Sequence, residues 1–263
     1  MEGTAFLIVL LGLAIGSFLN AVIYRLDQID TLLTERSRCP RCKKKLSWWE
    51  LIPILSYLLL RGKCYGCKKP ISIQYPLVEI TTALFFYLTY VYFGLTVHAA
   101  FLVFMGCLLL VTAFYDLNRL LVPYETLVPA IVVGASYWIT RALLNTTTTR
   151  AAAGLDLLLT YGLGALVGAA ALGALVLLGR RRWMGEGDVV VALAMGLFVG
   201  FPAIIVALFS AFVLGSLAST FLIAFKSAKM KDAIPFAPFL VLGTFIALFW
   251  ADPIIHWYVT LTF

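Results

Sequence analysis

Long apolar segments follow one another along most of the chain, separated by short polar stretches. Each is close to the roughly 17–25 residues that a helix needs to cross the hydrocarbon core of a bilayer. The sixth and seventh are separated only by Gly200-Phe201-Pro202, which must break one long run into two. We expect eight membrane helices, near residues 4–24, 76–95, 98–115, 121–142, 157–179, 185–201, 203–225 and 235–256. The pattern predicts an all-α polytopic membrane protein of about eight transmembrane helices.

The composition agrees with a bilayer as the solvent. The 263 residues are 62% hydrophobic and only 13% charged, whereas a soluble domain has about 25% charged residues. The first segment is not expected to be a cleaved signal peptide, because the chain opens with Met1-Glu2-Gly3 and lacks a basic start. The net charge of +7 is explained by where the charges lie, and we expect no nucleic acid as a partner.

The distribution of Lys and Arg predicts the orientation. With eight helices, 18 of the 20 basic residues fall on one side of the membrane, and only Arg141 and Arg150 fall on the other. By the positive-inside rule the basic side is cytoplasmic, so both termini face outward. We expect three parts: a first helix (1–24), a cytoplasmic insert (25–75) and a seven-helix membrane domain (76–263).

The insert carries four cysteines in two pairs, "CPRC" and "CYGC", separated by 21 residues. Two such pairs suit a tetrahedral zinc site of four thiolates, with no open position for a substrate. We therefore expect a structural zinc, with nearby Lys and Arg offsetting the negative charge of the site. Two disulfides or four idle thiols are the alternatives, and a reducing cytoplasm disfavours disulfides. The expected ligands are Cys39, Cys42, Cys64 and Cys67. The fifth cysteine, Cys107, is expected to be a small core residue.

Thirteen acidic residues divide into two groups by position. Eight lie in loops or at outer helix ends and need no function: Glu2, Asp27, Asp30, Glu35, Glu50, Asp156, Asp232 and Asp252. Five lie at or near the predicted cytoplasmic ends of helices: Glu79, Asp116, Glu125, Glu186 and Asp188. Ionisable groups at membrane depth are costly, so these five are the candidates for function.

Two of the five suit an aspartic protease. Asp116 closes the third predicted helix and Asp188 opens the sixth, so the topology places both on one side at similar depth. Two carboxylates that share a proton can activate water and protonate a scissile carbonyl. Gly185 and Gly187 have no Cβ and would let a substrate strand approach closely.

Simpler roles remain open for the same acidic residues. Asp188 could be a plain N-cap stabilised by the helix dipole, and Asp116 could pair with Arg119. Glu125 could cap the fourth helix. Glu186 is expected to be solvated or paired with a nearby Arg rather than catalytic.

Five motifs in order resemble one family, the type IV prepilin peptidases of pilus and type II secretion systems. The motifs are "GSFLNAVIYRL" (16–26), the cysteine region (39–79), "YDLNRLLVP" (115–123), "GEGD" (185–188) and "IPFAPFL" (234–240). The resemblance implies a bifunctional enzyme that cleaves the basic leader of type IV prepilins or pseudopilins after a glycine, at the cytoplasmic face of the inner membrane. It would then methylate the new N-terminus with S-adenosylmethionine. The resemblance also makes Asp116 and Asp188 the catalytic pair.

Three positions depart from the family pattern. Tyr124 follows Pro123 where the family often has Asp, and Ala237 replaces the glycine of the last motif. Val190 stands where a lysine usually follows the second aspartate, which puts some substrate or electrostatic role in doubt.

Methyl transfer rests on the resemblance alone, because no Gly-rich strand-turn-helix signature is present. Glu79 is its candidate residue, and a helix-start charge is the alternative for Glu79.

Two other classes of protein share some of these features. A presenilin-like or preflagellin-type protease also carries "YD" and "GxGD", but it is not expected to have the cysteine-rich insert. A zinc-binding membrane transporter without proteolysis would use the carboxylates for an ion path. Transporters place such groups near the bilayer midplane, whereas these carboxylates lie at the predicted cytoplasmic ends of helices.

Overall fold

The computed structural model describes residues 2–28, 36–146, 151–181, 183–225 and 234–262. Within these ranges the regular structure is helical, and the only β pairing consists of two isolated bridges, Arg38–Lys45 and Lys63–Pro70. Eight of the charged residues counted above lie outside the described residues: Asp30, Glu35, Arg150, Arg182, Lys226, Lys229, Lys231 and Asp232.

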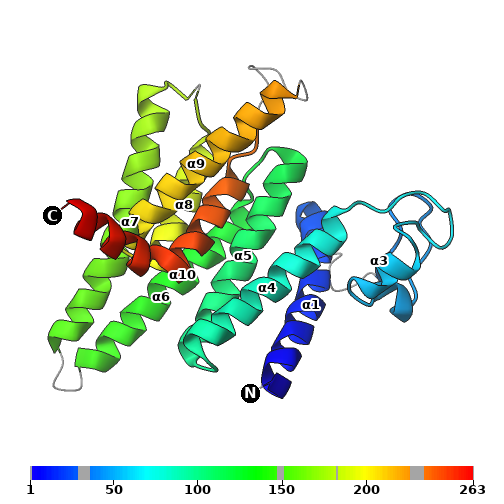
Figure 1. The fold of residues 1–263 in the computed structure, drawn as a ribbon, viewed down its shortest axis with the longest axis horizontal. Helices are drawn as coiled ribbons and strands as arrows, with labels where there is room; N and C mark the ends of the chain where they lie inside the picture. The colour runs from blue at the N-terminus through cyan, green and yellow to red at the C-terminus, as the bar shows by residue number, and fades with distance from the viewer. Residues whose placement is uncertain (1, 29–35, 147–150, 182, 226–233, 263) are drawn as a thin grey trace. The chain divides into compact units, whose positions relative to one another are not determined.

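Eight long helices match the eight apolar segments in order (Figure 1). They are α1 (Glu2–Arg25), α4 (Gln74–Phe93), α5 (Val97–Arg119), α6 (Tyr124–Thr146), α7 (Ala151–Leu178), α8 (Glu186–Val199), α9 (Ala203–Ala224) and α10 (Ala237–Thr262). Seven of them are long and apolar enough to cross a membrane. The exception, α8, has 14 residues, about 21 Å of helix. The prediction of an all-α multi-helix membrane protein is confirmed.

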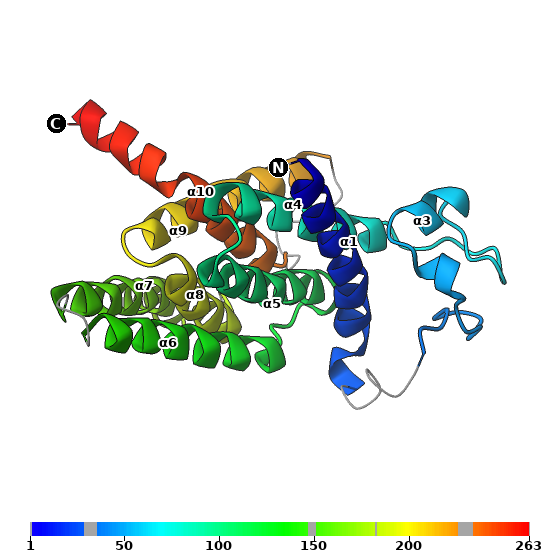
Figure 2. The same cartoon turned by 90° about the horizontal axis from the view of Figure 1, so that it is seen from below.

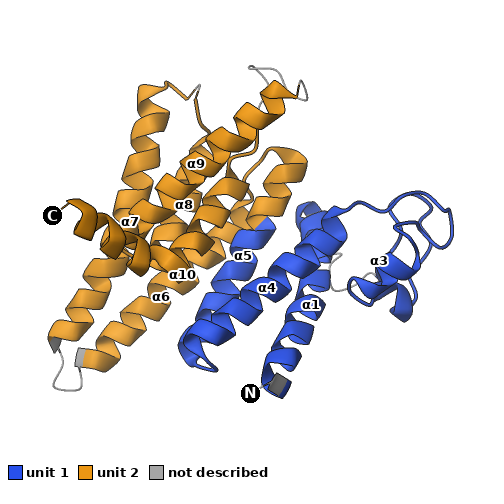
Figure 3. Ribbon diagram, in the orientation of Figure 1, with its two compact units in different colours: residues 1–111 blue, residues 112–263 orange. Residues whose placement is uncertain are grey.

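The chain forms two compact units, residues 1–111 and 112–263, and the boundary falls inside α5 (Figure 3). In the first unit α1 packs against α4 at very short range. A Cβ added to Gly12 would lie 2.6 Å from the Ala83 Cα, and one added to Gly16 would lie 2.7 Å from the Glu79 Cα. Only glycine permits that approach, which gives the "GSFLN" motif a packing role.

In the second unit α8 is held firmly by its neighbours. Figure 2 shows α6, α7 and α8 side by side. A Cβ on Gly196 of α8 would clash with the Gly164 backbone of α7. The Trp138 indole N–H of α6 donates to the Leu197 carbonyl at 2.7 Å. Gly200, with φ +74°, ends α8 at the break that the sequence predicts.

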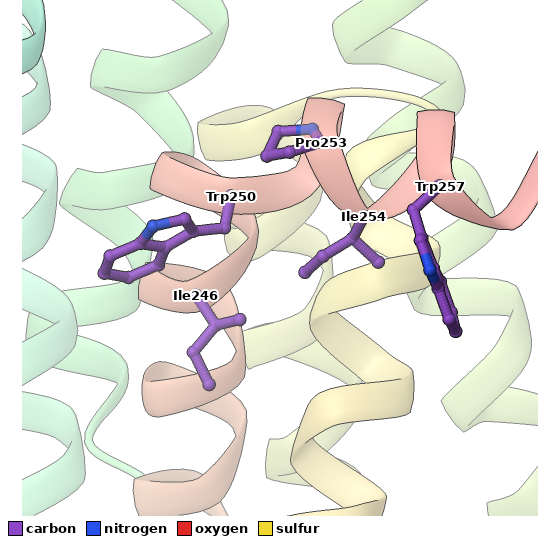
Figure 4. Close-up of a pocket in the computed structure, with 5 residues that line it drawn as sticks. All are labelled: Ile246, Trp250, Pro253, Ile254 and Trp257. Carbon is purple, nitrogen blue, oxygen red and sulfur yellow. The ribbon is translucent and has the colours of Figure 1, made fainter.

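The helix α10 carries an apolar depression in its middle and C-terminal part. Ile246, Trp250, Pro253, Ile254 and Trp257 line it, all from this one helix (Figure 4). Pro253 cannot donate a backbone hydrogen bond, which locally weakens the helix. Lipid chains cover such surfaces in a membrane-spanning helix, so we assign no site to it.

Where the structure describes the insert of the first unit, its helices are short. Between α1 and α4 the described residues include the 3-10 helices η1 (Leu26–Gln28) and η2 (Trp48–Leu51) and one short α-helix, α3 (Leu55–Leu59). So little regular structure cannot bury a sizeable core, and the cysteine region must be stabilised in another way.

Candidate active site and metal centre

Asp116 lies in the last turn of α5 and is buried. The helix ends one turn later, where the Leu120 N–H donates to the Asp116 carbonyl at 2.8 Å and Leu120 adopts a positive φ of 54°. The Asp116 Oδ2 accepts a hydrogen bond of 3.1 Å from the backbone N–H of Ala237. The carboxylate is therefore held by the first residue of α10.

The "IPFAPFL" sequence explains why this amide is available. The N–H groups of Phe239 and Leu240 both donate to the Phe236 carbonyl, and Pro238 has no N–H. Ala237 keeps a donor that the helix does not use, as at every helix start. The positive end of α10 thus faces the carboxylate of Asp116.

Asp188 is the third residue of α8 and is also buried. The N-cap of α8 is Gly185, with extended backbone angles of φ −77° and ψ 151°. The interpretation of Asp188 as a plain N-cap is therefore wrong. Asp116 is near enough for its charge to act on Asp188, so the second unit brings together the two carboxylates that the sequence pairs.

The two glycines of "GEGD" have different surroundings. A Cβ on Gly187 would lie 2.6 Å from the Val122 Cβ, in the turn between α5 and α6. A Cβ on Gly185 would meet nothing closer than the Asp188 Oδ2, at 3.8 Å, and Gly185 is exposed. Gly187 therefore lets the Val122 turn pack beside Asp188, while Gly185 leaves open the space that an approaching substrate needs.

Glu186 and Val190 each lie two residues from Asp188 in the sequence. Glu186 forms an ion pair with the Arg181 Nε at 2.7 Å, and both side chains are largely exposed. The prediction of an Arg-paired surface role for Glu186 is confirmed. Val190 is half-buried, and nothing in the structure explains why it replaces the lysine that the family pattern leads us to expect.

The four cysteines of the insert form one cluster. Their Sγ atoms all lie within 4.8 Å of one another, and all four are free thiols, which excludes the alternative of two disulfides. A tetrahedral zinc with Zn–S bonds of about 2.3 Å requires sulfur separations of about 3.8 Å. The Sγ atoms of Cys42 and Cys64 are 3.9 Å apart, so this donor set fits a zinc ion.

Two identical backbone turns present these thiols. In the first, the Cys39 N–H donates to the Lys44 carbonyl and the Lys43 N–H donates to the Cys39 carbonyl, both at 2.9 Å. The second turn repeats both bonds around Cys64 at the same distances. Lys43 and its counterpart Lys68 both adopt a left-handed φ, 58° and 57°. The cluster is thus built from two copies of one local structure.

The thiols of Cys39 and Cys42 differ in how readily they ionise. Burial opposes ionisation of Cys39, but hydrogen bonds from the backbone at Cys42 and Arg41 outweigh it and lower the pKa of Cys39 to about 7. At Cys42 the backbone at Lys44 favours the thiolate, but burial and the neighbouring thiols raise its pKa to about 11. A dication is needed to stabilise four thiolates at such short range.

Glu50 supports the cluster, contrary to the expectation that it needs no function. It is buried, accepts the Ser47 N–H at 2.8 Å and binds the Lys44 Nζ at 3.1 Å. The same Nζ lies 4.6 Å from the centre of the Tyr65 ring, inside "CYGC". Burial raises the pKa of Glu50, but the Ser47 amide and the Lys44 ammonium outweigh it and leave that pKa below its usual value.

Glu79 is buried in the second turn of α4. Its Oε2 accepts the Ile54 N–H at 2.7 Å, and the Ser17 side chain also interacts with its carboxyl group. The interpretation of Glu79 as a helix-start charge is wrong, because it is the sixth residue of α4 rather than part of its first turn. The carboxylate instead joins α1, α4 and the insert.

Sequence reasoning missed three contributors: the Ala237 amide, the Val122 contact and the buried Glu50. A signal existed for Glu50, since Ser47-Trp48-Trp49-Glu50 has the S-x-x-E pattern of a capping box, which the structure contains. A weaker signal existed for Ala237, because Pro238 marks a helix start. Nothing local in the sequence pairs Val122 with Gly187.

Comparison with known proteins gives matches along most of the chain. Residues 10–93 match the family model of the bacterial peptidase A24 N-terminal domain, and residues 101–220 match that of the type IV leader peptidase family. No solved structure matches the chain.

Several curated proteins named prepilin leader peptidase/N-methyltransferase are similar to this chain, among them two over more than nine-tenths of their length and one over a shorter segment. The Legionella pneumophila protein is 31% identical over 275 residues, covering 95% of this chain and 92% of that protein. The Aeromonas hydrophila protein is 31% identical over 280 residues, covering 97% and 93%. A Myxococcus xanthus protein of the same name is 44% identical over 124 residues, covering 47% and 37%.

Proposed function

The chain belongs to the type IV leader peptidase family, and from that premise we propose that it cleaves and then N-methylates type IV prepilins or pseudopilins. The observation that carries this proposal is the similarity to prepilin leader peptidase/N-methyltransferases over more than nine-tenths of both chains. It is a multi-pass protein of the inner membrane. The comparisons give no support to a presenilin-like protease or to a transporter.

Asp116 and Asp188 are the catalytic pair in this proposal. One carboxylate, ionised, takes a proton from water as the water oxygen attacks the scissile carbonyl carbon. The other, protonated, donates its proton to the carbonyl oxygen. As the tetrahedral intermediate collapses, the C–N bond breaks. The carboxyl group that took the proton from water passes it to the leaving amine, and the other carboxylate takes a proton back from a hydroxyl of the intermediate. The burial of both groups and the amide that holds Asp116 support these roles.

The leader would be a short basic segment cut after a glycine, at the cytoplasmic face. The excess of Lys and Arg on one side of the predicted topology supports this orientation, with both termini outside. Gly185, which is exposed beside Asp188, is where we expect the extended leader to approach. Glu186 takes no part in the chemistry because Arg181 already pairs with it.

Co-expression with a prepilin tests the proposal, with the intact mass of the product reporting cleavage and methylation together. Asp188→Asn should lower cleavage by about 10²–10⁴-fold, the usual contribution of a general acid or base, and Asp116→Asn should do the same. Glu186→Gln, two residues from Asp188, is the matched control and should cleave normally. Normal processing by either Asp variant would remove the pair from the mechanism.

We further propose a structural zinc ion bound by Cys39, Cys42, Cys64 and Cys67. The sulfur separations and the paired turns support it. With four thiolates the site leaves no open position for a substrate, so the ion would stabilise the insert rather than react.

Methyl transfer needs a donor and a base, and we propose Glu79 as the base. S-adenosylmethionine would supply the methyl group. As the neutral N-terminal amine would form its bond to the methyl carbon, the bond between that carbon and the donor sulfur would break and S-adenosylhomocysteine would leave. The methylated amine would then lose a proton, and the Glu79 carboxylate would accept it. A buried carboxylate held by the Ile54 amide suits a cationic partner, which supports this role.

Glu79→Gln tests this role against a matched control. It should lower methylation of the processed pilin and leave cleavage unchanged. Glu50→Gln removes the charge of another buried carboxylate of the same unit and should leave the methylated fraction unchanged. Full methylation by Glu79→Gln would exclude Glu79 as the base.

A further inference from the structure

The insert exposes an unusual amount of apolar surface. Trp48, Leu58 and Leu59 are 79%, 64% and 68% exposed, and Leu51 and Leu55 are exposed as well. On α3, the leucines at 55, 58 and 59 have the i, i+3, i+4 spacing of a single helix face. On η2, Trp48 and Leu51 are three residues apart and so lie on the same side of a 3-10 helix.

This segment lies beside the membrane helices rather than beyond their ends. The Ser17 hydroxyl of α1 donates to the Leu51 carbonyl at 3.5 Å, and Glu79 of α4 binds the Ile54 N–H. Ser17 precedes Arg25, the last residue of α1, by eight residues, which is about 12 Å along the helix axis. Figures 1 and 2 both show α3 to the side of the α1–α4 pair.

Residues 36–73 of the insert carry exposed charge of one sign. Between residues 36 and 73 the single acidic residue is Glu50, which is buried against Lys44. The exposed basic residues are Arg36, Arg38, Arg41, Lys43, Lys45, Arg61, Lys63, Lys68 and Lys69. Such a surface attracts anions and repels a basic peptide such as the expected leader.

We propose that residues 48–59 form an in-plane membrane anchor, whose apolar side chains enter the bilayer interface while the surrounding Lys and Arg bind anionic phospholipid headgroups. Apolar surface with adjacent basic residues is how interfacial segments bind membranes. Tryptophan is enriched at the interface, and Trp48 is the most exposed aromatic ring of the insert. The sequence predicts a cytoplasmic insert, and this anchor would attach that insert to the leaflet.

Trp48 provides a direct test in the zinc-loaded, full-length protein. The protein is placed in nanodiscs of phosphatidylglycerol or of phosphatidylcholine, each with brominated acyl chains. Because the chain has six tryptophans, the Trp48 emission is obtained as the difference between the wild type and Trp48→Phe. We expect bromine to quench this difference emission in both bilayers, at least twofold more in phosphatidylglycerol, with little quenching by aqueous acrylamide.

Two results would overturn the anchor. One is a Trp48 emission that acrylamide quenches freely and bromine does not. The other is protection of Trp48 from acrylamide only after a prepilin is added, which would assign the surface to the substrate.

Two variants separate the apolar and charged parts of the anchor. Leu58→Ser/Leu59→Ser should at least halve the bromine quenching of Trp48 in both lipids. Arg61→Gln/Lys63→Gln should remove most of the preference for phosphatidylglycerol and leave quenching in phosphatidylcholine unchanged. Zinc content of about one per chain in each variant shows that the insert is still folded. Unchanged quenching in both folded variants would contradict the proposal.

Discussion

The aspartate pair and the cysteine cluster both consist of side chains from distant parts of the chain. Long helices position the aspartates, whereas short turns position the cysteines. The four thiols come from two copies of one turn, in an insert whose helices are short in the part of the chain that the structure describes. The two carboxylates come from α5 and α8, and the first amide of α10 holds one of them. In the insert the proposed zinc site would stabilise the backbone, whereas in the helical unit the backbone positions the side chains.

This difference predicts different consequences of substitution. Removing a cysteine should unfold its surroundings, because an insert this small would depend on the zinc ion that we propose. Removing an aspartate should abolish the chemistry and leave the fold, because the helices around it pack through other residues. Substitutions that alter backbone groups near Asp116 and Asp188 should be as informative as changes to the carboxylates.

The largest effect is expected from Cys39→Ser. Structural zinc sites contribute on the order of 10 kcal/mol of apparent binding free energy, so losing a ligand should release the metal and unfold the insert. Metal analysis should find much less than one zinc per chain, and limited proteolysis should cut within residues 36–73. Cys107→Ser in α5 is the control and should keep the metal. A full zinc content in Cys39→Ser would contradict the four-thiolate site.

A smaller but clear loss is expected when Ala237 loses its amide hydrogen. Proline is tolerated at the first position of a helix, so Ala237→Pro changes mainly the donor to Asp116. Losing a hydrogen bond to a charged group costs about 1.5–3 kcal/mol, so kcat should fall roughly 10- to 150-fold. Ala237→Gly keeps the amide and should retain most of the activity. Equal kcat values for the two variants would show that the amide is dispensable.

The two glycines of "GEGD" should respond differently to alanine. Gly187→Ala drives a methyl group into Val122, and overpacking of this kind costs about 1–3 kcal/mol, so the melting temperature should fall along with cleavage. Adding Val122→Ala should restore both. Gly185→Ala has space for its methyl group, so it should leave the melting temperature unchanged and raise KM by hindering the leader. A stable, fully active Gly187→Ala would refute the packing role.

The smallest effect concerns pH and Glu50. Because the folded-state pKa of Glu50 is lowered, its contribution to stability is present above the unfolded-state pKa of about 4.3. That contribution is lost as the pH falls through the lower, folded-state pKa. Proteolysis of the insert from pH 7 down to about pH 3 should therefore show a difference between wild type and Glu50→Gln that is constant above about pH 5 and narrows below the unfolded-state pKa of about 4.3. If the difference in proteolysis between the two proteins widened as the pH fell, ionised Glu50 would not be the stabilising form.

The sequence by itself predicted the helices and the cluster of four cysteines. The lengths of the apolar segments predicted eight helices, and most of the predicted helix ends are within a few residues of the observed ones. For the seven helices long enough to cross a membrane, the reason is that a bilayer leaves little choice of structure. The thiol cluster could also be predicted from the sequence. Each "CxxC" folds into its own turn, and two such turns supply the four sulfur ligands that a structural zinc site prefers. The pairing of Asp116 with Asp188 followed from topology and from the resemblance together.

Only the tertiary structure decided what holds those residues. The Ala237 amide comes from a helix more than a hundred residues after Asp116, and a backbone donor leaves no trace in residue type. Val122 and Gly187 meet through packing between a turn and a helix, which depends on three-dimensional distance rather than on periodicity. Glu50 changed from an expected surface charge to a buried one because Lys44 and the Ser47 amide compensate its burial. Long-range contacts of this kind depend on the whole fold, and local sequence patterns do not encode them.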